Sequence, residues 1–179
     1  MKGLLRLSDG IDRVTLVFGW IAAWLVLFVT LISAGNAMSR YMFSLSSNAW
    51  LEIQWQLFSG IFLLGAAQVL KMNGHVRVDL VYGSVPQRGK LWIDILGIIF
   101  FLFPTMLVLT YFSWHFFVPS FQSGEHSSNT GGLLFWPVKL LMPVGFGLVF
   151  LQGVSELIKR FAALGGLVDE PVEYEAPMQ

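Results

Sequence analysis

The sequence contains no cysteine and few charged residues. Charged side chains make up 12% of its 179 residues, about half of the roughly 25% that soluble domains carry. Without cysteine the chain has no disulfide framework, no thiol chemistry and no thiolate metal site. Its 11 basic residues balance its 11 acidic ones, so it lacks the bulk positive field that attracts nucleic acids. The shortage of charge points instead to a membrane protein.

The sequence contains long apolar runs. Hydrophobic residues make up 55% of the chain, and residues 14–39 form a run of 26 positions without a charge. At about 1.5 Å per residue this run can cross a hydrocarbon core of about 30 Å. It is too long for the apolar part of a usual secretory signal. We predict an all-α membrane protein with four transmembrane helices, at about 14–39, 48–70, 92–118 and 135–158.

The segments around these spans have patterns of their own. We expect residues 1–166 to form a single four-helix domain, and the acidic residues 167–179 to be a disordered tail. After the second span, apolar residues at 78, 81, 82 and 85 recur at helical spacing. A short amphipathic helix lying in the membrane interface fits this pattern, and a plain connecting loop fits it nearly as well. Pro104 predicts a kink in the third span, and the Ser- and Gly-rich stretch 119–137 reads as a loop.

The positive charges predict how the chain is oriented. Nine of the 11 Lys and Arg residues lie at the N-terminus, between the second and third spans, or after the fourth span. Only Arg40 and Lys139 lie on the other side. Because basic residues accumulate on the cytoplasmic side of membrane proteins, we expect both termini to be cytoplasmic.

The second span carries a polar stripe at one end. Asn48, Glu52, Gln56 and Ser59 recur at helical spacing. Lipid offers such groups no hydrogen-bond partner, so we expect them to face protein or water. Glu52 lies close to the interface, which argues against ion coupling by this chain alone. We favour a structural pairing of Glu52 with Arg40, with a neighbouring subunit or with lipid headgroups.

No cofactor or catalytic site emerges from the sequence. A haem between helices needs two axial ligands, and His115 is the only histidine within a span. No catalytic triad, phosphate-binding glycine loop or metal-ligand spacing is present. The first span has a small-residue face suited to close helix packing, formed by Ala23, Thr30, Ala34 and Ala37. These features favour a non-enzymatic subunit over two alternatives, a membrane anchor of a respiratory redox enzyme and a small stand-alone cation-coupled antiporter.

A set of short motifs resembles a known family. The sequence is similar to the small membrane subunit, DctQ type, of tripartite ATP-independent periplasmic (TRAP) transporters over about residues 10–160. The motifs that carry this resemblance are Asn36-x3-Arg40-Tyr41-x-Phe43, Trp50-x-Glu52, Gly65-Ala66-Ala67 and His75-x-x-Val78-Asp79. Later motifs resemble a subgroup labelled for mannitol or chloroaromatic compounds, and these are Ser127-Ser128-Asn129-x-Gly131-Gly132, Trp136-Pro137-x-Lys139 and Gln152-Gly153-x-x-Glu156.

The resemblance implies a function. It implies a bacterial inner-membrane symporter, usually driven by sodium, for organic acids or related anionic solutes that a periplasmic binding protein delivers. The large membrane subunit would hold the substrate and sodium sites, and this chain would brace it. No catalytic, cofactor or metal residue is implied. We predict that the residues at a partner or lipid interface are Asn36, Arg40, Tyr41, Trp50, Glu52, Gln56, His75, Asp79, Trp136 and Lys139.

Overall fold

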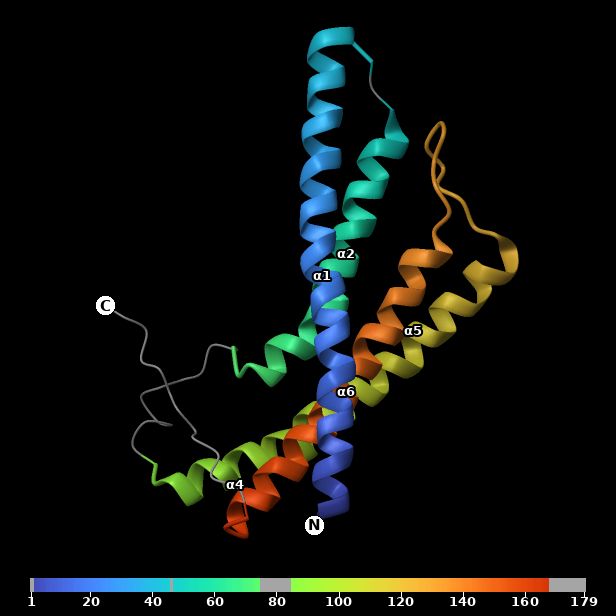
Figure 1. The fold of residues 1–179 in the computed structure, drawn as a ribbon. Helices are drawn as coiled ribbons and strands as arrows, with labels where there is room; N and C mark the ends of the chain where they lie inside the picture. The colour runs from blue at the N-terminus through green and yellow to red at the C-terminus, as the bar shows by residue number, and fades with distance from the viewer. Residues whose placement is uncertain (1, 46, 75–84, 168–179) are drawn as a thin grey trace.

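The computed structural model describes residues 2–45, 47–74 and 85–167 (Figure 1). Within these ranges the chain is helical and forms no strand; one isolated bridge joins His126 and Leu134. The helices are α1 (Lys2–Phe43), α2 (Asn48–Lys71), α4 (Gln87–Gly97), the π-helix η1 (Ile98–Leu102), α5 (Phe103–Ser123) and α6 (Trp136–Leu164). The predicted interfacial helix and the tail after residue 167 lie outside the described residues, except for Val85.

Four helical spans are long and apolar enough to cross a membrane. They are α1, α2, the continuous run of α4, η1 and α5, and α6. The chain is therefore a multi-pass membrane protein, and the four predicted spans are confirmed. The helices extend beyond the apolar runs. Helix α1 begins 12 residues before the predicted residue 14, and α6 ends six residues after the predicted residue 158.

Helix α6 lies at the centre of the fold. It packs against α1, α2 and α5, while α1 pairs with α2 (Figure 1). Glycines on α6 allow this close approach. A Cβ atom at Gly145 would lie 2.7 Å from the backbone oxygen of Leu63, and one at Gly153 would lie 2.7 Å from a methyl group of Leu102. Small residues at membrane helix contacts let backbones approach in this way.

The buried face of α1 differs from the face that the sequence predicted. Its buried residues are Ser8, Thr15, Ala22 and Val29, which recur every seven positions. A seven-residue repeat keeps one seam of a helix against its neighbour. The predicted small-residue face, which begins one position later with Ala23, remains exposed. Part of this face lines an open groove beside Phe58 of α2, where another helix can approach.

The third span is irregular near Pro104. The π-helix η1 ends two residues before this proline. Proline lacks an N–H group and its ring clashes with the carbonyl of the preceding turn. A widened turn relieves this clash. The irregularity therefore lies where Pro104 predicted a kink.

Candidate partner interface and the contacts that support it

Glu52 binds a loop of its own chain. Its side chain is 4% exposed, and one carboxylate oxygen accepts hydrogen bonds from the Ser127 hydroxyl and from Asn129 Nδ2, the latter at 2.8 Å. The other oxygen accepts a hydrogen bond from the Leu133 backbone N–H at 2.7 Å. A carboxylate that accepts three hydrogen bonds is well satisfied without a cation.

These contacts correct our expectation that Glu52 pairs with Arg40. Arg40 is exposed near the end of α1, and its guanidinium lies 5.8 Å from the centroid of the Tyr41 ring. The loop at residues 124–135, which we call the 124–135 loop, occupies the place beside Glu52 instead. Donors from a loop between two other helices satisfy the carboxylate, so an arginine on the adjoining span is not needed.

The rest of the polar stripe also faces the 124–135 loop. Gln56 Nε2 donates to the Leu134 carbonyl at 3.1 Å, and Asn48 Nδ2 donates to the Thr130 carbonyl at 3.4 Å. The stripe on α2 therefore anchors the loop through both side-chain and backbone atoms. A loop that reads as flexible in sequence is held against the end of the second span.

A second attachment joins the 124–135 loop to α6. Glu125 and Lys139 form an ion pair, and the Lys139 ammonium lies 4.1 Å from the centroid of the Phe116 ring. The hydrogen bond from Lys139 holds the pKa of the Glu125 carboxyl below its ordinary value of 4.5. Because the pKa of Glu125 is lower in the folded state than in the unfolded state, its ion pair stabilises the fold at pH values above the unfolded pKa. This stabilisation is lost as the pH falls through the folded pKa. The attachment is therefore present at neutral pH. Next to it, the Trp136 and Phe121 rings meet edge to face, with their centroids 5.3 Å apart.

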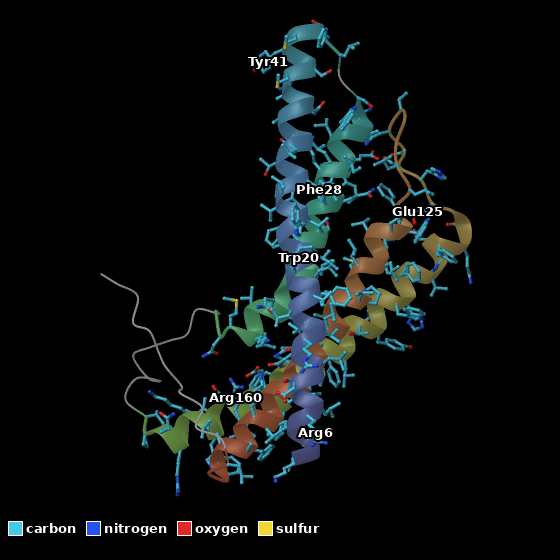
Figure 2. The ribbon with its side chains drawn as sticks, in the orientation of Figure 1. Arg6, Trp20, Phe28, Tyr41, Glu125 and Arg160 are labelled. Atoms are coloured by element: carbon cyan, nitrogen blue, oxygen red, sulfur yellow. The ribbon has the colours of Figure 1, made fainter. Side chains whose placement is uncertain are left out.

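A larger polar network lies at the opposite end of the bundle, near the start of α1 and the end of α6. Figure 2 shows Arg160 at this end and Glu125 at the loop end. We call it the α1–α6 network, and its residues come from four helices. They are Ser8, Asp12 and Thr15 of α1, Lys71 of α2, Asp94 of α4, and Gln152, Ser155, Glu156, Lys159 and Arg160 of α6.

Asp12 is the main acceptor on the α1 side of this network. Its carboxylate accepts hydrogen bonds from Ser155 Oγ and Lys159 Nζ, both at 2.7 Å, and from Gln152 Nε2 at 3.1 Å. Lys71 Nζ lies 3.6 Å away. Asp12 thereby joins α1 to both α6 and α2.

Glu156 and Arg160 extend the network to α4. Arg160 Nη1 donates to Glu156 at 2.6 Å, and Arg160 Nε donates to Asp94 at 3.0 Å. Lys159 Nζ also donates to Glu156, at 3.0 Å. Three carboxylates thus face three cations, and their formal charges cancel. An arrangement in which buried charges satisfy one another holds helices in register and offers no surplus charge to a solute.

Sequence reasoning missed the α1–α6 network. Asp12 precedes the predicted first span, and Lys159 and Arg160 follow the predicted fourth span, so apolar length alone places all three outside the spans. The sequence does contain a pattern that indicates the α6 side of this network. Gln152, Ser155, Glu156, Lys159 and Arg160 recur at three- and four-residue spacing, which places them along one side of a helix.

The ten predicted interface residues separate into different environments. Glu52, Gln56 and Lys139 hold the 124–135 loop, whereas Trp136 contacts Phe121 of α5. Tyr41 is 83% exposed and Trp50 is 51% exposed. Arg40 is also exposed, and Asn36 is half-buried; Figure 2 shows Tyr41 at the end of α1 farthest from Arg6. His75 and Asp79 lie outside the described residues.

Exposed aromatic side chains line one face of α1. Trp20, Trp24 and Phe28 follow one another at four-residue spacing and are 65%, 44% and 50% exposed. Figure 2 shows Trp20 and Phe28 along this helix. These three rings contact one another along α1 and stay largely exposed, so this face of the helix is apolar.

Comparison with known proteins gives one family. The family model of the DctQ component of tripartite ATP-independent periplasmic transporters matches residues 29–163. A search of curated protein sequences gives no match. The matched region covers about three quarters of the 179 residues and includes all of α2, α4, η1 and α5 and nearly all of α6. The chain therefore belongs to the DctQ family of TRAP transporter components.

Proposed function

We propose that this chain is the small, non-catalytic scaffold subunit of a TRAP transporter in the bacterial inner membrane. In this role it braces the large permease subunit during sodium-coupled uptake of an organic acid or related anionic solute. A periplasmic binding protein delivers the solute. Membership of the DctQ family supports the transporter assignment, and the division of labour between the subunits is our proposal.

The carrying observation is that the four carboxylates that are buried or half-buried in the described helices all accept hydrogen bonds within the chain. Glu52 is satisfied by the 124–135 loop, and Asp12, Asp94 and Glu156 each accept hydrogen bonds from groups of the α1–α6 network. A transport site needs polar groups near the membrane midplane that are available to a solute or ion. The internal pairing of these carboxylates therefore supports a structural role, in which this chain braces the large subunit.

Two outward surfaces support packing against a larger helical partner. Thr30, Ala34 and Ala37 line a groove of about 410 Å³ together with Phe58. Small residues favour close contact between membrane helices. The nearby face with Trp20 and Trp24 adds apolar area that lipid or protein can cover. Contact with the large subunit at the small-residue groove is part of the proposal.

The proposal predicts that this chain transports nothing by itself. Reconstituted alone into liposomes, with a sodium gradient and the binding protein present, it should give no solute uptake above empty liposomes, because the buried carboxylates of its described helices already accept hydrogen bonds within the chain. Together with the large subunit it should co-purify and restore uptake. Uptake by the chain alone, abolished by substitutions within its spans, would show that the transport site lies here.

A second prediction concerns orientation, which the charge distribution supports. The chain lacks cysteine, so single cysteines can be introduced without background labelling. In intact cells, a cysteine at Ser128 in the 124–135 loop should react with a membrane-impermeant thiol reagent, and one at Gln87, the first residue of α4, should not. Both positions are exposed, and labelling after membrane disruption controls for reactivity. The reverse pattern would place the termini in the periplasm.

A further inference from the structure

A groove opens between α2 and α5 beneath the 124–135 loop. Its walls include Trp55 and Leu63 of α2 and Phe116 of α5, and Met142 of α6 lies at its base. Both α2 and α5 pack against α6. Trp55 and Phe116 are 42% and 52% exposed, so the groove opens sideways. These walls belong to membrane-spanning helices, and the opening therefore faces the bilayer.

The size of the groove decides what can occupy it. Its volume of about 410 Å³ is within the roughly 300–1,000 Å³ of ligand sites. From Trp55 to Leu63, α2 rises about 12 Å, so the groove is long enough to hold part of one extended acyl chain. A single hydrocarbon chain fits it.

The loop end of the groove carries one positive and one negative group. Lys139 and Glu125 both line the groove and are paired with each other, and their side chains are 13% and 40% exposed. The phosphate of a lipid could accept a hydrogen bond from Lys139, and a primary ammonium could donate to Glu125. This rim is complementary to a headgroup that carries both charges. An anionic headgroup would place its net negative charge beside Glu125.

We propose that this groove binds one membrane phospholipid with a zwitterionic headgroup. One acyl chain lies between α2 and α5 along Trp55, Leu63 and Phe116, and the headgroup meets the Glu125–Lys139 pair. The bound lipid closes the side of the bundle that the helices leave open and touches the base of the 124–135 loop. The inference requires only that these spans lie in a bilayer, so it is independent of the proposed role in transport.

Lipid retention tests this assignment. The full-length chain is reconstituted in nanodiscs of equal phosphatidylethanolamine and phosphatidylglycerol, washed with detergent and analysed by native mass spectrometry. The wild-type protein should retain one phosphatidylethanolamine. Met142→Trp should lower retention about tenfold, a change of about 1.4 kcal/mol, because the larger indole ring fills space that the acyl chain would occupy. Met38→Trp is the matched control, because Met38 is 61% exposed on α1, and it should retain the lipid.

A second variant tests the headgroup assignment without filling the groove. Glu125→Gln leaves Lys139 without its anionic partner, so retention should shift toward phosphatidylglycerol. Equal retention by wild type and Met142→Trp would overturn the lipid site. If Met142→Trp lowers lipid retention, but both phospholipids are retained equally and Glu125→Gln changes nothing, the headgroup assignment would be overturned. Loss of the lipid whenever the large subunit co-purifies would assign the groove to a protein partner instead.

Discussion

Replacing Asp12 with alanine is expected to destabilise the folded chain by roughly 2–4 kcal/mol, somewhat less than the 3–5 kcal/mol cost of truncating a fully buried ion pair. Asp12 is partly buried, with a side chain that is 16% exposed. Its removal leaves Lys159, Ser155 and Gln152 without their shared acceptor. Lys159 and Gln152 still donate to Glu156, and Ser155 still donates to the Ser8 carbonyl, so the cost is the loss of three bonds to a charged acceptor and not three wholly unsatisfied groups. The measurement is unfolding of the purified chain by sodium dodecyl sulfate in mixed micelles, followed by circular dichroism.

Asp9→Ala is the matched control for this variant. Asp9 lies on the same helix and is exposed, so its loss should change stability by less than about 0.5 kcal/mol. A double variant, Asp12→Ala with Lys159→Met, removes both charges of the 2.7 Å pair. It should be less destabilised than the sum of the two single variants, because the Asp12–Lys159 interaction that each single variant removes is counted only once. Equal effects of Asp9→Ala and Asp12→Ala would show that the α1–α6 network does not hold the bundle together.

The α1–α6 network also explains why α1 and α6 extend beyond their apolar runs. Apolar length alone predicts the number of spans, because crossing a bilayer requires about 20 apolar residues. It does not predict where a helix ends. Ser8 and Asp12 continue α1 before the apolar run, and Lys159 and Arg160 continue α6 after it. Their helical placement depends on contacts between residues nearly 150 positions apart, which local pattern does not contain.

Helical periodicity predicted polar and small-residue stripes but not what they face. The stripe of Asn48, Glu52 and Gln56 was visible in the sequence, whereas its partner, the 124–135 loop, depends on how α5 and α6 pack. The same limit applies to α1. Both its buried residue Ala22 and its exposed neighbour Ala23 are small, so composition does not distinguish the face that meets α6 and α2 from the face that remains exposed.

The Glu52 contacts separate a structural role from a role in ion movement. Glu52→Ala should release the 124–135 loop, because Leu133, Ser127 and Asn129 lose their acceptor. Hydrogen exchange reports this directly, since the Leu133 amide bonds to the carboxylate. In peptides covering residues 126–135, exchange should speed up by about one order of magnitude or more, the change that loss of a single good hydrogen bond to a charged group produces.

Glu52→Gln provides the conservative comparison. An amide oxygen still accepts from Leu133 or Ser127, while the second acceptor becomes a donor that faces other donors. Exchange in the loop should therefore lie between those of wild type and Glu52→Ala. Gln54→Ala is the matched control on the same helix, because the Gln54 side chain bonds only to the Trp50 carbonyl one turn away. In Gln54→Ala, hydrogen exchange in the 124–135 loop should equal that of the wild-type protein.

Transport by the complete transporter then tests the division of roles. If Glu52 only holds the loop, Glu52→Gln should retain the sodium dependence and the coupling ratio of the wild-type complex, even where the uptake rate falls. A rate that falls in parallel with the loss of loop protection supports a structural role, because the loop and the rate then respond to the same contacts. A changed coupling ratio with an unchanged loop would place Glu52 in the ion pathway. The two readouts are separable because exchange follows the Leu133 amide, whereas coupling follows the ions that cross the membrane.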